Sequence, residues 1–354
     1  MINLYLQKYA FLALSAAALF GASTPLAKLL LHDISPVMLA GLLYLGSGAG
    51  LFVIRSIRSR FRPDRAKRES ALETGDYPWL AGAVLAGGIV APVMLMWGLS
   101  GATASAASLL LNFESIITTL IAAAIFREAV GGRIWLASLV MLAGGLLLSY
   151  DPDARFNLSL NSIAVIGACL MWAIDNNLTR RISAGDPVTI AMIKGLAAGA
   201  VNIVLGQYGG DAMPGMWSLA GSMTLGFFSY GLSLVLFIYA LRHLGSARTG
   251  AHFSTAPFIG AAVAILALEE PFTLVFAGAL LLMVLATWLV LTEQHEHEHE
   301  HESIKHGHEH IHDEHHQHEH DGTEGPEPHT HAHVHLPLRH AHPHLPDIHH
   351  RHEH

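Results

Sequence analysis

The segment LASLVMLAGGLLLSY, residues 136–150, decides the fold class. An amphipathic helix of a soluble protein keeps a polar stripe, whereas this segment has almost none, so lipid suits it better than water. A helix needs roughly 20 apolar residues to cross the hydrocarbon core of a bilayer. Nine other segments of the chain approach this length and composition. The sequence therefore predicts an all-α integral membrane protein with ten transmembrane helices. The predicted spans are 8–31, 37–55, 78–99, 103–126, 132–150, 162–181, 187–208, 215–241, 246–268 and 271–291.

The composition divides the chain into two unlike parts. The whole chain has 354 residues, of which 52% are hydrophobic and 14% charged. Residues 293–354 contain 23 of the 26 histidines, together with 14 acidic and only 3 basic residues. The chain is thus an apolar body followed by an acidic, histidine-rich tail. Its single cysteine, Cys169, excludes an intrachain disulfide and a cysteine-based metal cluster.

The basic residues predict the orientation of the body in the membrane. Residues 55–69, RSIRSRFRPDRAKRE, contain seven Lys or Arg and form the longest loop between spans. Cytoplasmic loops carry an excess of Lys and Arg, so this loop and the N-terminus are expected in the cytoplasm of a cell whose inner membrane holds the protein. Ten spans then return the C-terminal tail to the same side. Arg155, on a predicted outer loop, is an exception to the pattern.

The two halves of the body resemble each other in sequence. NFESIITTLIAAAIFREAV, residues 112–130, aligns with STAPFIGAAVAILALEEPF, residues 254–272, and this register matches Glu128 with Glu270. Five spans per half is an odd number, so the halves have opposite orientations, as in many secondary transporters. The predicted domains are a first repeat over 1–150, a second repeat over 151–292, and a tail over 293–354.

Three features carry a resemblance to a known family. They are the ten spans in two halves, the small and aromatic residues that begin each half (Phe20-Gly21 and Trp172-Ala173), and the acidic residue that ends the fourth span of each half. On these features residues 8–291 resemble the EamA-type permeases of the drug/metabolite transporter superfamily.

This resemblance implies a cavity lined by spans 1–4 and 6–9, with spans 5 and 10 packed outside it. It implies export of amino acids, metabolites or drugs, and some members with histidine-rich termini are linked to nickel or cobalt resistance. The family often has a proline after an acidic residue in the fourth span, whereas Ser115 follows Glu114 here.

Ionisable residues inside the spans are candidates for function, because each costs several kcal/mol unless it is paired or hydrated. Glu114 lies near the middle of the fourth span and is predicted to bind cargo or carry a proton. Asp175 and Lys194 lie at a similar depth in spans 6 and 7. They form either a structural ion pair or part of the coupling site. His252 lies in span 9, at the same depth as Asp175.

Two kinds of cargo fit these residues. One imidazole and two carboxylates suit Ni²⁺, Co²⁺ or Zn²⁺, which predicts a metal vestibule of Asp175 and His252 with Glu114 deeper. Lys194 instead suits an anionic or amino-acid cargo. The side chains of Asn112, Asn176 and Asn177 are predicted in the substrate cavity and serve either kind of cargo.

The tail lacks apolar periodicity and is predicted to be disordered without metal. In HEHEHEHE, residues 295–302, an extended chain places the imidazoles on one side and the carboxylates on the other. Neutral imidazole is the commonest metal ligand, so several divalent ions are expected to bind. The predicted tail ligands are His295, His297, His299, His301, His306, His308, His310, His312, His315, His316, His318 and His320.

The sequence favours proton-coupled efflux of a divalent transition metal by a secondary transporter. One alternative is an exporter of an amino acid or other organic metabolite with a metal-binding regulatory tail, and a second is a membrane-tethered metal store or sensor. No catalytic residue, enzymatic activity or required cofactor is predicted beyond divalent metal ions on the tail. The expected partners are the lipid bilayer and the cargo, without nucleic acid, and the sequence leaves a homodimer open.

Overall fold

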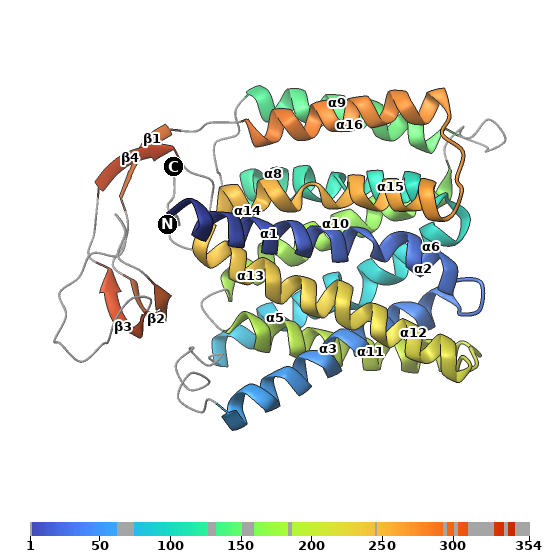
Figure 1. Cartoon of the computed structure of the whole chain (residues 1–354), viewed down its shortest axis with the longest axis horizontal. Coiled ribbons are helices and arrows are strands. Elements are labelled where there is room, and N and C mark those ends of the chain that lie inside the picture. The colour runs from blue at the N-terminus through green and yellow to red at the C-terminus, as the bar shows by residue number, and fades with distance from the viewer. Residues whose placement is uncertain are drawn as a thin grey trace.

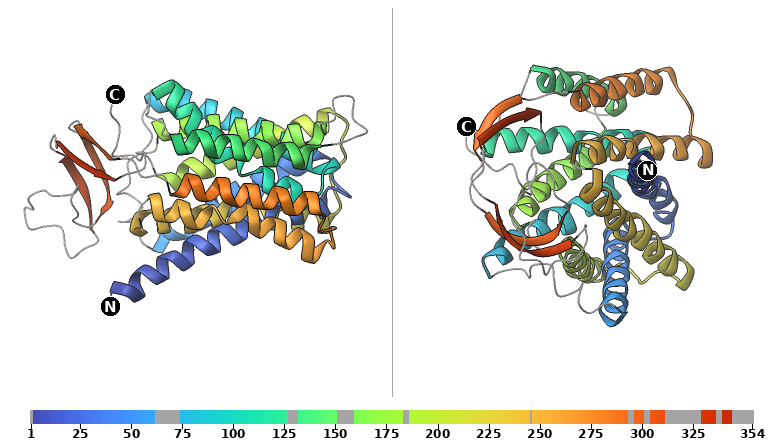
Figure 2. Two further views of the ribbon diagram at one scale, coloured as in Figure 1. Left: turned by 90° about the horizontal axis from the view of Figure 1, so that it is seen from above. Right: turned by 60° about the vertical axis from the view of Figure 1, so that its left-hand side comes forward.

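The computed structural model describes residues 2–61, 74–126, 132–150, 159–182, 186–244, 246–292, 296–300, 304–310, 329–335 and 339–343. The body is a bundle of helices that run mostly along its longest axis (Figure 1). The N-terminus lies at one end of the bundle, here called the tail end, and the opposite end is called the far end (Figure 2). Successive spans alternate in direction between these two ends.

The body helices have the following bounds: α1 Ile2–Gly21, α2 Ser23–Leu30, α3 Pro36–Phe61, α5 Tyr77–Ala83, α6 Ala91–Gly101, α7 Ala104–Leu110, α8 Phe113–Phe126, α9 Gly132–Ser149, α10 Leu160–Arg181, α11 Pro187–Tyr208, α12 Met216–Gly226, α13 Ser233–Leu244, α14 Ser246–Phe253, α15 Ala256–Ala267 and α16 Leu274–Leu291. A short 3₁₀ helix, η1, covers Thr74–Asp76, and two π-helices, η2 and η3, cover Val84–Val90 and Phe227–Leu232.

The prediction of an all-α membrane protein is confirmed. Within the described residues, nine helical segments are long and apolar enough to cross a membrane. The remaining predicted span, 246–268, is present as two shorter helices, α14 and α15, with Pro257 in the first turn of α15. Proline lacks the N–H that would continue the hydrogen-bond ladder, which explains the break.

The two π-helices occupy matching positions in the two halves. The register that aligns Glu128 with Glu270 places residues 84–90 opposite residues 226–232. The structure has η2 at 84–90 in the third span and η3 at 227–232 in the eighth. Because π-helical turns are rare and often lie at functional sites, their shared register is independent support for an internal repeat. The domain boundaries themselves stay a prediction.

Spans 2 and 7 pack backbone against backbone. A Cβ atom on Gly195 of α11 would lie 2.7 Å from the backbone nitrogen of Gly48 of α3. A Cβ atom on Gly199 would lie 2.7 Å from the Cα of Leu45. Small residues allow membrane helices to approach this closely. Spans 5 and 10, α9 and α16, pack together as a layer at one side of the bundle (Figure 1).

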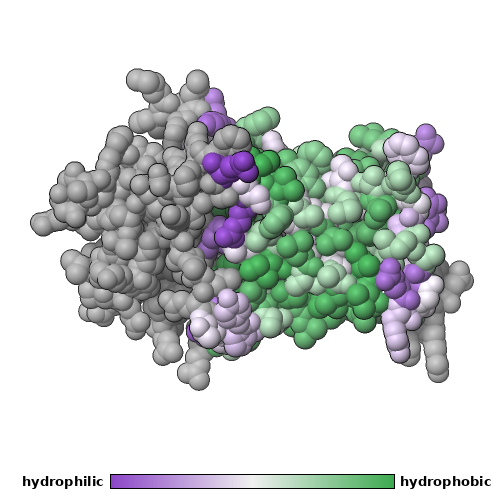
Figure 3. All heavy atoms as spheres, turned by 90° about the horizontal axis from the view of Figure 1, so that it is seen from below, coloured by the Kyte–Doolittle hydropathy of each residue, from purple (hydrophilic) through white to green (hydrophobic). Residues whose placement is uncertain are grey.

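The surface of the body carries an apolar belt. In Figure 3 hydrophobic residues cover the middle of the visible face, and hydrophilic residues lie at its two ends. Large apolar side chains such as Leu139, Val204 and Leu281 are more than 60% exposed, a pattern that fits contact with lipid. The chain is therefore an integral membrane protein.

The tail contains four strands, although the sequence predicts a tail without regular structure. They are β1 Glu296–Glu300, β2 Ile304–His310, β3 His329–His335 and β4 Arg339–Pro343. β1 pairs with β4 and β2 with β3, both antiparallel. An alternation of two residue types has the period of a strand, and the pairing satisfies backbone groups that a disordered chain leaves to water.

Candidate functional site

The candidate site begins at Glu114, in the first turn of α8. A break at Leu111 and Asn112 separates α7 from α8 within the fourth span, so Glu114 follows directly on irregular backbone. Its Oε1 accepts a hydrogen bond of 2.9 Å from Nδ2 of Asn176 on α10. The same amide lies 3.3 Å from Oγ1 of Thr118, one turn further along α8. A carboxylate in the fourth span is thereby linked to the sixth.

An ion pair adjoins this contact. Both carboxylate oxygens of Asp175 lie 2.6 Å from Nζ of Lys194 on α11, and Oγ1 of Thr179 donates to Oδ1 at 2.9 Å. The side chains of Asp175 and Lys194 are 8% and 17% exposed. The ion pair that the sequence raised between spans 6 and 7 is therefore formed.

The π-helix η2 makes room for this ion pair. A Cβ atom on Gly87 would overlap the Asp175 carboxylate, so only glycine fits there. The Gly87 carbonyl accepts hydrogen bonds from the hydroxyl of Tyr44, at 2.7 Å, and from Nε1 of Trp172, at 3.0 Å. A π-helical turn releases carbonyls from the regular ladder, and these two side chains satisfy one of them.

A series of aromatic contacts extends from Tyr44 toward the first span. The rings of Tyr44 and Tyr230 lie 5.6 Å apart, and those of Tyr230 and Phe20 lie 5.8 Å apart at 81°. Phe20 also contacts Phe253, with centroids 5.5 Å apart. These separations are typical of favourable aromatic pairs. The centre of the bundle thus combines a few polar groups with a cluster of aromatic side chains.

The other predicted cavity residues lie in different surroundings. Asn177 donates to the carbonyls of Ala173, at 2.8 Å, and Thr118, at 3.3 Å. Asn112 is buried and donates to the Leu109 carbonyl at 2.9 Å, while its Oδ1 accepts from Thr287 of α16 at 3.4 Å. Asn112 therefore joins span 4 to span 10 instead of facing Glu114.

His252 does not join the carboxylates. It is in the last turn of α14 and is half-buried. Within the part of the chain that the structure describes, no three His, Cys, Asp or Glu side chains lie close enough to hold a metal ion. Five tail histidines, at 297, 299, 306, 308 and 310, lie on β1 and β2. The others predicted as ligands, at 295, 301, 312, 315, 316, 318 and 320, lie outside the described residues.

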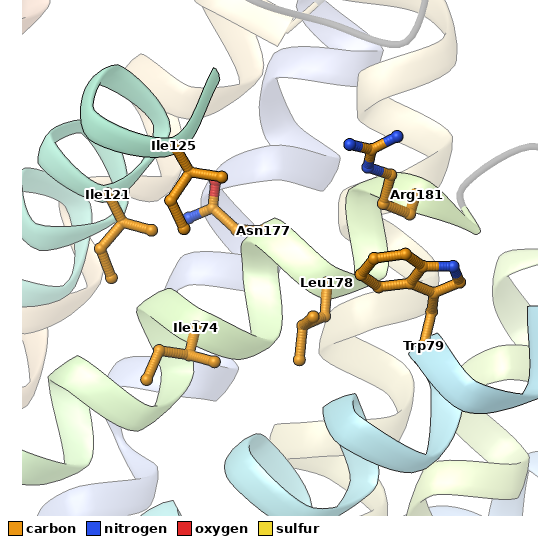
Figure 4. A pocket seen from close by; sticks show the side chains of 7 residues that line it. All are labelled: Trp79, Ile121, Ile125, Ile174, Asn177, Leu178 and Arg181. Atoms are coloured by element: carbon orange, nitrogen blue, oxygen red, sulfur yellow. The ribbon is translucent and has the colours of Figure 1, made fainter. Parts of the chain in front are cut away.

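A cavity of about 140 Å³ lies between α5, α8 and α10, and its lining includes Arg181, the last residue of α10 (Figure 4). Ile121 and Ile125 line one side of it, and Trp79 lines the other with Arg181, whose guanidinium lies 5.5 Å from the Trp79 ring centroid. Asn177 lines the cavity as well and follows Asn176 in the chain. Neither Glu114 nor Asn176 is among the residues that line it.

Sequence reasoning missed Tyr44, Gly87 and Thr118 as members of the site. Tyr44 had a signal, because it is a hydroxyl-bearing residue in the middle of an apolar span. Gly87 had none, since glycines occur throughout the membrane helices and only the position of Asp175 makes this one necessary.

Apolar helices in two halves, with a polar cluster at their centre, define a polytopic membrane transporter. The chain belongs to the EamA-like transporter family, which residues 7–150 and 160–292 match. An uncharacterized transporter from Methanothermobacter thermautotrophicus is 29% identical over 275 residues, which cover 74% of this chain and 79% of that protein. The fold is also similar to a crystal structure with a TM-score of 0.59 and 17% identity, covering 80% of this chain and 95% of the other.

Proposed function

We propose that the chain is a proton-coupled exporter of a small organic solute that carries a positively charged amine. The observation that carries this proposal is the Glu114 carboxylate. It accepts a hydrogen bond from Asn176 and, within the described residues, it takes part in no ion pair. Inside a membrane such a carboxylate needs either a proton or a cationic ligand. Competition between the two for one group is the basis of exchange.

The neighbouring residues support an organic cargo. Asp175 is already neutralised by Lys194, which leaves Glu114 as the acidic group open to a cargo amine. Trp172 lies one turn before Asn176 on the same face of α10, and aromatic faces attract organic cations. Export is proposed because the basic loop 55–69 favours a cytoplasmic tail end, and the cavity of Figure 4 lies toward this end of the bundle.

A divalent metal is the second candidate, and the tail is the observation that favours it. Residues 293–354 hold 23 histidines, and β2 pairs with β3 so that His306, His308 and His310 are opposite other histidines. The described part of the membrane body gives this candidate no support, because it holds no group of metal-binding side chains. The tail is therefore proposed as a metal-responsive regulator or a collector of metal.

Proton movement in proteoliposomes tests the proposal. The full chain is reconstituted with a pH-sensitive dye inside, and small amines, amino acids, Ni²⁺, Co²⁺ and Zn²⁺ are added in turn. We expect amine-driven proton flux in the native chain and none in Glu114→Gln, which keeps the oxygen that accepts from Asn176 but removes the charge. Asp33→Asn, at an exposed carboxylate of the far end, is the matched control and should transport normally.

The same assay separates the alternatives. Flux driven by a metal and lost in Glu114→Gln would replace the organic cargo with the second candidate. Normal amine-driven flux in Glu114→Gln would overturn the assignment of Glu114 as the coupling group.

A further inference from the structure

A carboxylate from the second half of the chain caps a helix of the first half at the far end. Glu270 lies in the connection between α15 and α16. Its Oε1 accepts from the backbone nitrogen of Ala104 at 2.6 Å, and its Oε2 accepts from that of Ser105 at 2.8 Å. These are the first two N–H groups of α7, which no carbonyl within the helix can satisfy. The charge also suits the positive end of the helix.

The Lys28 ammonium group binds the other side of the turn between α6 and α7. Nζ of Lys28, in the last turn of α2, donates to the carbonyls of Leu99, Ser100 and Ala102 at 2.7, 3.1 and 2.9 Å. These carbonyls end α6, where a positive charge is favourable. The turn that joins spans 3 and 4 is therefore clamped from one side by span 1 and from the other by the connection after span 9.

The bundle is closed at the end where these contacts lie. α7 packs against α15, and a Cβ atom on Gly260 would lie 2.6 Å from the Gly21 carbonyl oxygen and 2.7 Å from Oγ of Ser108. At the tail end, the described part of span 4, α8, packs mainly on α10 and not on α14. Among the described residues, the close packing of spans 4 and 9 is therefore in their far halves, and the cavity of Figure 4 lies toward the tail end.

We propose that Glu270 and Lys28 form the far gate of the transport path, and that release of Glu270 from α7 opens it. The gate rests on the proposed function in that it assumes alternating access. Opening must separate α7 from α15, and the two hydrogen bonds of Glu270 directly oppose this movement. Neither residue contacts the Glu114 site in the structure. Both are therefore positioning residues that set which end is open.

The backbone beside the gate is strained in the closed state. Glu269 has a φ of +53°, and among the described residues it is the one non-glycine with a positive φ. Side chains other than glycine are disfavoured in this region, and strain of this kind gathers at switch segments. Opening that lets residue 269 relax would partly offset the loss of the hydrogen bonds.

Cysteine labelling of the full chain tests the gate without any cargo. In a Cys169→Ala background, Ser108→Cys places a thiol of similar size between α7 and Gly260, where the native hydroxyl is buried and makes no hydrogen bond among the described residues. Ile121→Cys places a second thiol in the cavity near the tail end. A membrane-impermeant thiol reagent is applied to intact cells for the far side and to inverted vesicles for the tail side.

When Glu270→Gln is added, we expect the reagent to modify the thiol of Ser108→Cys from the far side about tenfold faster. This is the effect of losing one charge-assisted hydrogen bond. Ile121→Cys should at the same time label more slowly from the tail side, because the two ends open alternately. Asp33→Asn, at an exposed carboxylate of the far end, should change neither rate. Lys28→Met should shift both rates in the same directions as Glu270→Gln, and it replaces that variant if Glu270→Gln does not reach the membrane.

An unchanged rate at Ser108→Cys, or a rise at both thiols, would overturn the gate, since general loosening exposes both positions. The result is independent of the cargo. A gate that fails while Glu114-dependent proton flux persists leaves the proposed function intact. Faster labelling at Ser108→Cys with slower labelling at Ile121→Cys, but no proton flux with any solute, would support the gate. The same result would contradict the proposed cargo.

Discussion

At the scale of single residues, the ion pair of Asp175 and Lys194 is one of the two alternatives that the sequence leaves open for these residues, and it is formed in the structure. Two opposite charges at equal depth in neighbouring spans have few alternatives in a membrane, so their pairing follows from the cost of leaving either alone. The partner of Glu114 was not predictable in this way. Asn176 reaches it across the bundle, and only the packing of α8 on α10 brings the two together.

This reasoning predicts unequal effects of single and double substitutions. Lys194→Met alone leaves the buried Asp175 carboxylate unpaired and should destabilise the protein by about 3–5 kcal/mol. Asp175→Asn combined with Lys194→Met removes both charges and should cost much less than that single substitution. Unfolding followed in detergent measures both. A double variant as unstable as Lys194→Met would show that the ion pair is not the cause.

At the scale of helices, the sequence located the spans, and it did so because apolar length is a local property. The breaks within the spans are harder to predict from the sequence. Pro257 marks the break before α15, but η3 contains no proline, so the sequence has no comparable signal for it. The period of two residues in the tail is typical of strands, whereas its polar composition is typical of disorder, so the sequence does not decide between them.

The contact of α3 with α11 predicts which glycines are essential. A Cβ atom on Gly48 would lie 2.7 Å from the carbonyl carbon of Gly195, with backbone rather than a flexible side chain in the way. Gly48→Ala should therefore destabilise the protein by about 1–3 kcal/mol. Gly221→Ala on α12 is the control, because its Cβ would meet only a methyl group of Leu30 at 3.6 Å. Thermal unfolding of both variants tests the difference, and equal melting temperatures would contradict the packing argument.

At the scale of the whole molecule, the body and the tail give different indications of the cargo. The body places Glu114 beside the Asn176 amide, whereas the tail concentrates histidines. The sequence predicts that the tail and the residues inside the membrane serve one cargo, a divalent metal. The structure gives this prediction less support. Asp175 near Glu114 is already paired with Lys194, and among the described residues no group of three His, Cys, Asp or Glu side chains forms. Spatial grouping of side chains is what a single sequence conveys least.

If body and tail act separately, metal binding should follow the tail alone. The full chain should bind several Ni²⁺ ions in calorimetric titration, and the body ending at Thr292 should bind none. Imidazole binds metal in its neutral form and has an ordinary pKa of about 6.5, so binding should weaken as the pH falls below that value. Amine-driven proton flux at saturating cargo should be the same in both forms. Stoichiometric Ni²⁺ binding by the truncated body would instead require a metal site within the membrane, and the metal would then become the preferred cargo.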